Sequence, residues 1–351
     1  MTVNNISMIY AEGVSVDKDP ELYFFPEELT RSRQCRDKGE YIVVKADVHF
    51  NMSELEGMFI PVFRKKTPFR QALNAKYKPN PQTLKTVLKL LLDKKLNLSV
   101  CLQGESGTGK TEMALYLSHM LNWPLTIKQI HSDLRPEDLE GERKLDNGST
   151  SFDLSDLAKG YRDGHLILLD EIDKIHPDTS AKLHMILEKK PWSVSAEGGL
   201  TIKPHEYTRF LGTANTNMSG SDARFLSSQK QDEAFIKRWL IVKFKPTTEL
   251  EMLHVLESHF PDIKTSVLTT FVKIAIAITK PERGVIMDKR NIVSWVQTCS
   301  LLADMPVSDA FDISFGNALN EDDYIEAQEH IKLEHETFFS TPFEELKSKK
   351  S

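Results

Sequence analysis

One eight-residue segment limits what this chain can fold into more than any other. Residues 104–111 read Gly-Glu-Ser-Gly-Thr-Gly-Lys-Thr and follow an apolar stretch that contains Val100 and Leu102. A segment with helical apolar spacing begins just after them, at Met113. The glycines let consecutive backbone N–H groups turn toward one point, and a helix N-terminus adds the positive end of its dipole. The order of strand, loop and helix therefore predicts an α/β fold that binds a nucleoside triphosphate.

The side chains of this loop have separate expected roles. Lys110 supplies a positive charge to the phosphates, and Thr111 offers a hydroxyl ligand to Mg²⁺. The predicted nucleotide-binding residues are Gly104, Glu105, Ser106, Gly107, Thr108, Gly109, Lys110 and Thr111. The expected cofactors are ATP and Mg²⁺, although these residues alone do not distinguish ATP from GTP.

Composition limits the class of protein and its cellular location but does not identify a function. The 351 residues include 45 Lys and Arg against 51 Asp and Glu, so the chain lacks the global positive charge of a nonspecific nucleic-acid binder. The three cysteines, Cys35, Cys101 and Cys299, are widely spaced, which favours reduced thiols. No apolar run reaches membrane-spanning length and no export signal is recognisable. We therefore expect a cytoplasmic protein without a membrane partner.

The apolar pattern predicts three regions. Residues 1–75 carry no chemical motif and are expected to form a small accessory domain, and residues 76–81, with two prolines, suit a linker. Residues 76–246 are expected to form the α/β nucleotide-binding core, and residues 247–351 an all-helical lid and tail. A helix is expected from residue 84 to residue 92 because apolar residues recur there at helical spacing.

Within the core, short apolar strands alternate with helical segments, which predicts a parallel sheet covered by helices on its faces. The expected strands span residues 98–103, 125–130, 165–170, 209–214 and 240–244. The expected lid helices span residues 247–260, 263–280, 288–304 and 321–339.

Polar residues at the ends of two buried strands are candidates for catalysis. Asp170 and Glu171 follow the apolar run 165–169, where parallel strands open onto a ligand crevice. We expect Asp170 to hold Mg²⁺ and Glu171 to polarise the attacking water. Asn215 follows the next strand and is a candidate sensor of the γ-phosphate. Asp173 is expected to be a helix-start or surface acid.

Two arginines complete the candidate site. Arg238 precedes the last strand of the core, where it can project from the subunit edge toward a neighbour's triphosphate, and Arg290 opens a lid helix. A guanidinium suits both positions because its planar fork binds phosphate oxygens and keeps its proton. The alternative for each is a surface salt-bridge partner.

Four segments in this order resemble the AAA+ ATPases. They are residues 104–111, Leu-Leu-Asp-Glu-Ile-Asp at 168–173, Gly-Thr-Ala-Asn-Thr-Asn at 212–217 and Lys-Arg-Trp at 237–239. Within that superfamily the chain resembles the MoxR branch, and most closely the CobS-type ATPase subunit of aerobic cobalt chelatase. The resemblance covers residues 84–300.

The resemblance implies further properties. Lys110 and Thr111 match the Walker A motif, Asp170 and Glu171 match Walker B, and Asn215 matches sensor 1. Arg238 then matches an arginine finger acting in trans, and Arg290 matches the sensor 2 arginine. Such proteins assemble as rings, usually hexamers, and use ATP hydrolysis to remodel a protein client, often one with a metal-dependent adhesion-type domain. Residues 133–148 and 192–203 would be inserts that face the pore or the client.

Two other functions stay open on the sequence. One is a nucleic-acid motor or loader built on the same core, and the other is a nucleotide-dependent scaffold or switch that turns over slowly. Similar ATPases also occur in viral genomes, so the expected location is either the cytoplasm of the protein's own cell or, for a viral protein, that of the host cell. The leading prediction is an ATP-hydrolysing ring motor that remodels or activates a partner protein.

Overall fold

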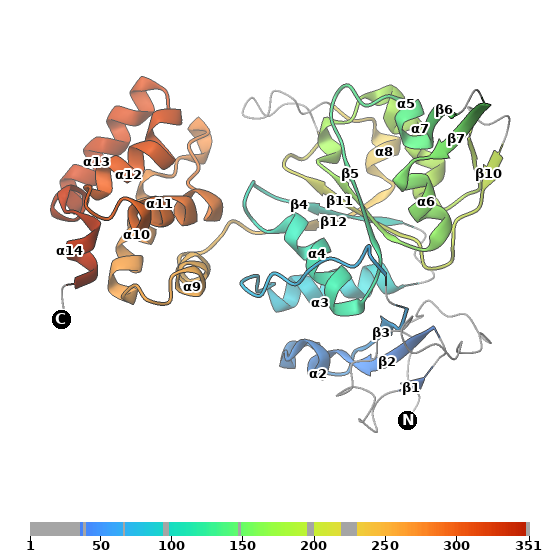
Figure 1. Ribbon diagram of the computed structural model, residues 1–351, viewed down its shortest axis with the longest axis horizontal. Helices are drawn as coiled ribbons and strands as arrows, with labels where there is room; N and C mark the ends of the chain where they lie inside the picture. The colour runs from blue at the N-terminus through green and yellow to red at the C-terminus, as the bar shows by residue number, and fades with distance from the viewer. Residues whose placement is uncertain are drawn as a thin grey trace. The chain divides into compact units, whose positions relative to one another are not determined.

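The computed structural model describes residues 36–37, 40–65, 67–93, 98–146, 149–194, 200–218 and 230–348. The chain divides into two compact units (Figure 1). The first comprises Met1–Gly104 and Gly109–Phe244, and the second comprises Glu105–Thr108 and Lys245–Ser351. Each unit has its own apolar core.

The first unit is built on a parallel five-stranded sheet with the strand order β12-β4-β11-β8-β5. The strands are β4 (Ser99–Gln103), β5 (Leu125–Gln129), β8 (Leu166–Asp170), β11 (Arg209–Ala214) and β12 (Trp239–Lys243). The sequence predicted all of these strands, each within one residue at either end. Because parallel strands end at the same edge of a sheet, the carboxyl ends of β4, β11 and β8 lie side by side.

Helices cover both faces of this sheet, as the alternation of strands and helices predicted. The helices are α3 (Pro81–Leu92) and α4 (Lys110–Leu121) on one face, and α5 (Pro136–Glu140), α6 (Asp156–Asp163), α7 (Pro177–Leu187) and α8 (Glu233–Ile236) on the other (Figure 1). In β8, Leu168 packs into the core that contains α3 and α4, whereas Leu169 packs into the core that contains α6 and α7. A strand buried on both faces needs a continuous apolar run, which explains the composition of β8.

Within the first unit, the described N-terminal residues form a small antiparallel sheet and a short helix. The strands are β1 (Arg36–Asp37), β2 (Tyr41–Lys45) and β3 (Phe59–Phe63), and the helix is α2 (Ala46–Phe50). Tyr41 and Val62 belong to the same apolar core as Leu84 of α3. The predicted boundary at residue 75 stays a prediction, and residues 1–35, 38–39 and 66 of the predicted accessory domain lie outside the described residues.

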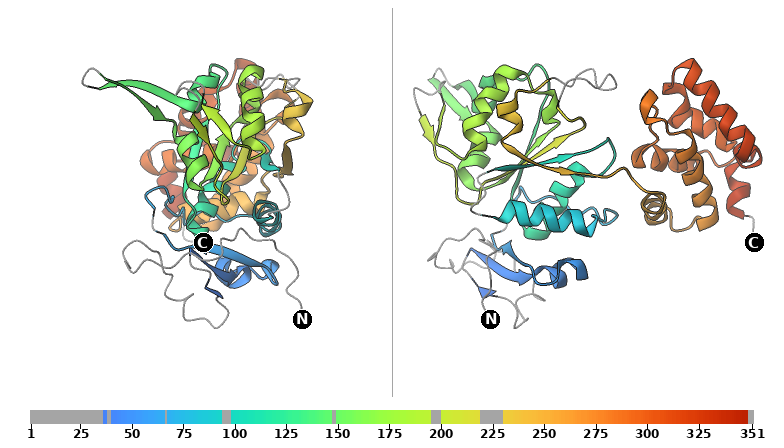
Figure 2. Two further views of the ribbon diagram at one scale, coloured as in Figure 1. Left: turned by 90° about the vertical axis from the view of Figure 1, so that its right-hand side faces the viewer. Right: turned by 180° about the vertical axis from the view of Figure 1, so that it is seen from behind.

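Two hairpins interrupt the core where inserts were predicted. They are formed by β6 (Gly141–Asp146) with β7 (Ser149–Leu154), and by β9 (Trp192–Val194) with β10 (Leu200–Ile202). The insert predicted at residues 192–203 therefore contains the β9–β10 hairpin, whereas the β6–β7 hairpin begins within the insert predicted at residues 133–148 and extends beyond it to Leu154. Residues 147–148 and 195–199 lie outside the described residues. Figure 2 shows the β6–β7 hairpin extending away from the sheet.

The second unit is helical beyond residue 246, as predicted. Its helices are α9 (Glu249–His259), α10 (Thr265–Ile278), α11 (Lys289–Leu301), α12 (Val307–Ser314), α13 (Glu321–Ser340) and α14 (Phe343–Ser348). The buried indole of Trp295 packs edge-on against Phe271 and Phe311 at its centre. In the part of the chain that the structure describes, no helix is both long and apolar enough to span a bilayer.

A partly buried lysine just after α7 gives this fold a pH-dependent stability. Lys189 has left-handed backbone geometry (φ +55°), and burial, together with the nearby Arg209, lowers the pKa of its ammonium group from 10.5 to about 7. The unfolded chain then binds more protons than the folded chain between pH 7 and 10.5, so this group makes the folded state more stable as pH rises through that range. We expect Lys189→Met to raise Tm by a few degrees at pH 7, with the gain shrinking toward pH 10. Thermal unfolding at several pH values measures this, and an equal gain at every pH would contradict the assignment.

Candidate functional site

The loop between β4 and α4 needs glycine at both of its ends. A Cβ atom on Gly104 would lie 2.8 Å from the Phe244 carbonyl oxygen. Gly109 has a φ of +91°, in the left-handed region that only glycine enters without strain. Between them, in the second unit, the Thr108 hydroxyl donates to the Glu105 carbonyl oxygen over 2.8 Å. The backbone therefore has the tight turn that the glycine spacing predicted.

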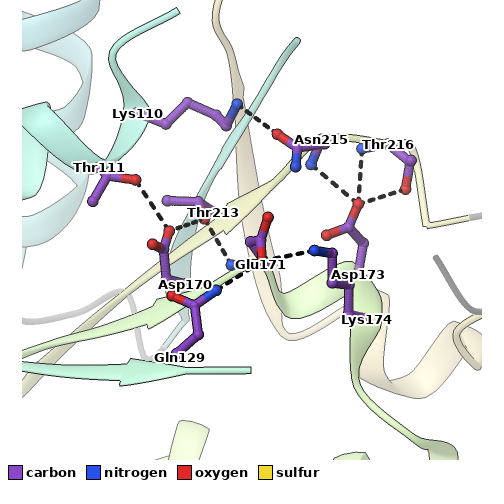
Figure 3. A network of polar contacts seen from close by, with 10 residues as sticks. All are labelled: Lys110, Thr111, Gln129, Asp170, Glu171, Asp173, Lys174, Thr213, Asn215 and Thr216. Atoms are coloured by element: carbon purple, nitrogen blue, oxygen red, sulfur yellow. Dashed lines mark hydrogen bonds and ion pairs between the residues drawn. The ribbon is translucent and has the colours of Figure 1, made fainter. Parts of the chain in front are cut away.

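Lys110, the first residue of α4, joins two of the predicted site residues. Its ammonium group donates to the Gly104 carbonyl oxygen over 2.7 Å and to Asn215 Oδ1 over 2.9 Å (Figure 3). The side chain is nearly buried. A lysine from the loop and an amide from the end of β11 thus meet at the carboxyl edge of the sheet. There the ammonium group of Lys110 and the side-chain NH₂ of Asn215 could both donate hydrogen bonds to a phosphate.

Thr111 and Asp170 form the second pair of predicted residues. The Thr111 hydroxyl donates to Asp170 Oδ1 over 3.1 Å, although 58 residues separate them along the chain (Figure 3). A hydroxyl and a carboxylate are hard oxygen donors, the kind that Mg²⁺ prefers while it keeps water and phosphate oxygens as its other ligands. The residues present therefore fit the Mg²⁺ ion that the sequence predicted.

Glu171 follows Asp170 and has an unusual backbone conformation. Its φ of +61° and ψ of +48° lie in the left-handed region, which is rare for a residue other than glycine and is found most often at functional sites. Its carboxylate accepts hydrogen bonds from Gln129 Nε2 over 2.7 Å and from Lys174 Nζ over 2.8 Å. Neither partner is recognisable from the sequence. Gln129 ends the neighbouring strand β5, so the parallel sheet places it beside Glu171.

Asp173 matches one of its two predicted settings. It lies in the first turn of a short 3₁₀ helix, Ile172–Lys174, as a helix-start acid does, but it is only 1% exposed and is not a surface acid. Its Oδ2 accepts hydrogen bonds from the backbone N–H groups of Asn215 and Thr216, over 3.1 and 3.0 Å, and from the Thr216 hydroxyl over 2.9 Å. The surface alternative was wrong because the tight turn after β8 directs this carboxylate under the end of β11 (Figure 3).

The proline-containing segment before α3 also contacts the loop. It is irregular, as its prolines predicted, and Asn80 caps α3 by accepting from the N–H groups of Gln82 and Thr83. Within it, the Tyr77 hydroxyl donates to the Gly109 carbonyl oxygen over 3.2 Å. Burial raises the pKa of this phenol, so it stays protonated and remains a donor. The segment is therefore a packed support for the loop as well as a connection.

Arg238 does not lie beside the other predicted site residues. It precedes β12, which runs parallel to β4, whereas Lys110 follows the opposite end of β4. The Arg238 guanidinium lies 2.6 Å from Glu188 Oε1 and donates to the Ala234 carbonyl oxygen over 2.6 Å. The pKa of Glu188 is lowered, chiefly by a hydrogen bond from Lys190 and also by the charge of Arg238. In this chain the arginine is held by its own unit.

Arg290 lies in the second unit, near the N-terminus of α11. Its side chain is exposed, and its backbone N–H donates to Asp288 Oδ1, which caps the helix, over 2.8 Å. Arg290 thus opens a helix of the second unit, as expected.

Comparison with known proteins identifies the family to which the nucleotide-binding segment is similar. A family model described as the AAA domain of the dynein-related subfamily matches residues 99–238, the segment that contains every site residue from Lys110 to Arg238. The denitrification regulatory protein NirQ of Stutzerimonas stutzeri is 30% identical over 93 residues, which are 26% of this chain and 34% of NirQ.

Two further relatives are uncharacterized proteins. That of Staphylococcus epidermidis is 25% identical over 172 residues, 48% of this chain and 62% of the relative. YojN of Bacillus subtilis is 23% identical over 231 residues, 64% of this chain and 73% of YojN. The chain spans about three fifths of the first of these relatives and about a third of NirQ.

The strands β4, β5, β8 and β11 of the parallel sheet, the loop before α4 and the acidic residues at the end of β8 lie within the segment that the family model matches, and β12 begins directly after it. The AAA domain also implies nucleotide binding, in agreement with the contacts of Lys110 and Thr111. The chain therefore contains an AAA domain of the dynein-related, MoxR-like type within residues 99–238.

Proposed function

We propose that this chain is a Mg²⁺-dependent ATPase that works as a ring and uses hydrolysis to remodel a partner protein. The observation that carries the proposal is the convergence of Lys110, Thr111, Asp170, Glu171 and Asn215 at the carboxyl edge of one sheet. A cation, oxygen ligands for Mg²⁺, a carboxylate and an amide are the parts that phosphoryl transfer to water requires.

Each residue of this group has a proposed role. Lys110 and Asn215 donate hydrogen bonds to the phosphates, and Thr111 and Asp170 hold Mg²⁺, which when bound neutralises phosphate charge. Glu171 accepts a hydrogen bond from the attacking water and orients it. The present contacts of Glu171 with Gln129 and Lys174 must then rearrange or share the carboxylate, because an oxygen of Glu171 has to face the water.

The arginine is proposed to act between subunits. Arg238 and Lys110 lie at opposite ends of the neighbouring strands β12 and β4, so Arg238 does not serve its own loop. A head-to-tail interface repeated around a closed ring would place the Arg238 edge of one protomer against the nucleotide of the next. The proposed assembly is a ring, with six protomers as the expected number. Arg290 is proposed as a second phosphate contact.

The client is proposed to be a protein. The β6–β7 and β9–β10 hairpins are the inserted elements of the core, and the first of them extends away from the sheet (Figure 2). The exposed Leu145 in β6 lies on that hairpin, where a moving ring would present it to a client. The net charge of −6 favours a protein over a nucleic acid as the client.

Mixing two inactive variants tests the proposed ring. Lys110→Ala removes the phosphate grip but keeps the arginine, and Arg238→Ala does the reverse. We expect each variant alone to lose ATP turnover by roughly 1,000-fold or more. In equimolar mixed rings, about a quarter of the subunit junctions pair an intact loop with an intact arginine, so turnover should return to a comparable fraction. Steady-state phosphate release measures it.

Lys237→Ala is the matched control for Arg238→Ala. Lys237 is the neighbouring cation and forms an exposed ion pair with Glu233 at 2.9 Å, so its loss should leave turnover within about twofold. A mixture no more active than its two components would refute catalysis between subunits. Absence of turnover by the wild-type protein with Mg²⁺ and ATP or GTP would overturn the proposal, and strong stimulation by DNA or RNA would favour a nucleic-acid motor instead.

A further inference from the structure

A buried threonine connects the two acidic residues at the end of β8. Thr213 lies in β11, the strand beside β8, and its side chain is 2% exposed. Its hydroxyl donates to Asp170 Oδ1 over 2.5 Å and accepts a hydrogen bond from the Glu171 backbone N–H over 2.9 Å (Figure 3). One hydroxyl group therefore contacts both consecutive residues.

The contact with Asp170 fixes how this carboxylate is turned. Asp170 Oδ1 accepts from Thr213 on one side and from Thr111 on the other, so two hydroxyls from different elements meet at one oxygen. Without the donor on β11, the carboxylate is free to rotate away from Thr111. Groups that hold a metal ligand in this way govern metal affinity although they do not touch the metal.

The contact with Glu171 supports a backbone that is otherwise unfavourable. A left-handed conformation at a residue other than glycine persists only where its surroundings determine it, and the Thr213 oxygen accepts the N–H of this residue. The direction in which the Glu171 side chain leaves the backbone depends on that conformation. Thr213 therefore acts on the carboxylate of Glu171 without contacting it.

Packing alone does not require this hydroxyl. Valine has nearly the shape of threonine and suits a buried strand, so the apolar part of the position could be filled without a polar atom. The hydroxyl of Thr213 donates to the Asp170 carboxylate and accepts from the Glu171 backbone N–H. A role in the site explains these two contacts better than packing does.

We propose that Thr213 is a positioning residue of the hydrolytic site, which aligns Asp170 for Mg²⁺ and holds Glu171 in its left-handed conformation. This inference rests on the proposed function of the same site. It assigns to β11 a task separate from that of Asn215, which lies two residues later and contacts Lys110.

The test compares Thr213→Val with Thr213→Ser in two backgrounds. In the Glu171→Gln background, where turnover is blocked, the Mg²⁺ concentration that half-saturates binding of a fluorescent ATP analogue is measured. We expect Thr213→Val to raise it roughly 10- to 100-fold. In the otherwise wild-type background we expect a similar loss in kcat with KM for ATP little changed at saturating Mg²⁺. Thr213→Ser keeps the hydroxyl and should restore both values to near wild type.

Thr126→Val is the matched control. Thr126 is a buried threonine of β5 in the same sheet, and its hydroxyl is hydrogen-bonded to His165 instead of to the site. It should change Tm without changing the Mg²⁺ dependence or kcat. If Thr213→Val does not fold, Thr213→Ala removes the same hydroxyl without adding bulk.

The outcomes separate this inference from the proposed function. An active wild-type protein whose Thr213→Val variant keeps its Mg²⁺ dependence and kcat would overturn the inference alone. Failure of Thr213→Ser to recover would also overturn it, because the hydroxyl would then not be the cause. An inactive wild-type protein would instead overturn the proposed function.

Discussion

Glu171→Gln should stop ATP hydrolysis while leaving ATP binding intact. The amide keeps the size of the side chain and can still contact Gln129, but it no longer offers a carboxylate to the attacking water. We expect kcat to fall at least about 100-fold, with the Kd for ATP within a few-fold of wild type. Phosphate release and equilibrium binding of a fluorescent ATP analogue measure the two quantities separately.

Glu112→Gln is the control for this change. Glu112 lies in the first turn of α4 and accepts a hydrogen bond from Asn74 over 3.2 Å, so it is an acidic residue close to the loop but outside the group of site residues. Its substitution should leave kcat within about twofold. Unchanged hydrolysis by Glu171→Gln would show that another group orients the water.

The same variant offers a route to the client. A ring that binds ATP but does not hydrolyse it should stay assembled and hold its partner, so affinity purification with Glu171→Gln plus ATP is expected to retain a protein that wild type releases. The comparison without nucleotide, and with Lys110→Ala, shows whether retention depends on bound ATP.

Asp173→Ala should cause the largest loss of stability among the site substitutions. It removes the acceptor for two backbone N–H groups and one hydroxyl at the end of β11, in a position that is 1% exposed. Leaving buried donors without an acceptor costs about 1–3 kcal/mol each, so we expect the free energy of unfolding to fall by about 3–5 kcal/mol. Chemical denaturation measures it, with Asp173→Asn expected to lose less because one oxygen remains.

Asp178→Ala is the matched control for that experiment. Asp178 lies only five residues later in the sequence, at the start of α7, but its side chain is 84% exposed. Its removal should cost no more than about 1 kcal/mol. If the two alanine variants were equally stable, the hydrogen bonds to Asp173 would not stabilise the fold as the structure indicates.

Much of the fold follows from the sequence because strong local patterns determine it. The apolar run of β8 and the helical spacing in α3 are explained by burial, and each was predicted to within a few residues. The short helices α12 and α14 were not predicted, because six to eight residues carry too little periodicity to separate a helix from a turn. Strand order was also beyond the sequence, because it depends on pairing between distant segments.

The candidate site was predictable where the chemistry is concentrated in a motif. The glycine loop and the acidic pair could be placed on strand ends by their neighbours in sequence. Gln129 and Thr213 could not, because each contacts Asp170 or Glu171 only after the strands have paired. Lys174 contacts Glu171 three residues away, in a 3₁₀ turn that no apolar pattern predicts. The burial of Asp173 was not foreseen for a related reason, since it results from a turn and not from an apolar pattern.

The strands β12 and β4 run parallel, and this has a mechanical consequence. A pair of five-residue parallel strands is a rigid spacer of about 16 Å, with Arg238 entering at one end and Lys110 leaving at the other. No side-chain rearrangement shortens that span. If both residues are needed to hydrolyse one triphosphate, an isolated protomer lacks half of the catalytic groups at any nucleotide concentration. The protein concentration, which controls assembly, would then determine the activity.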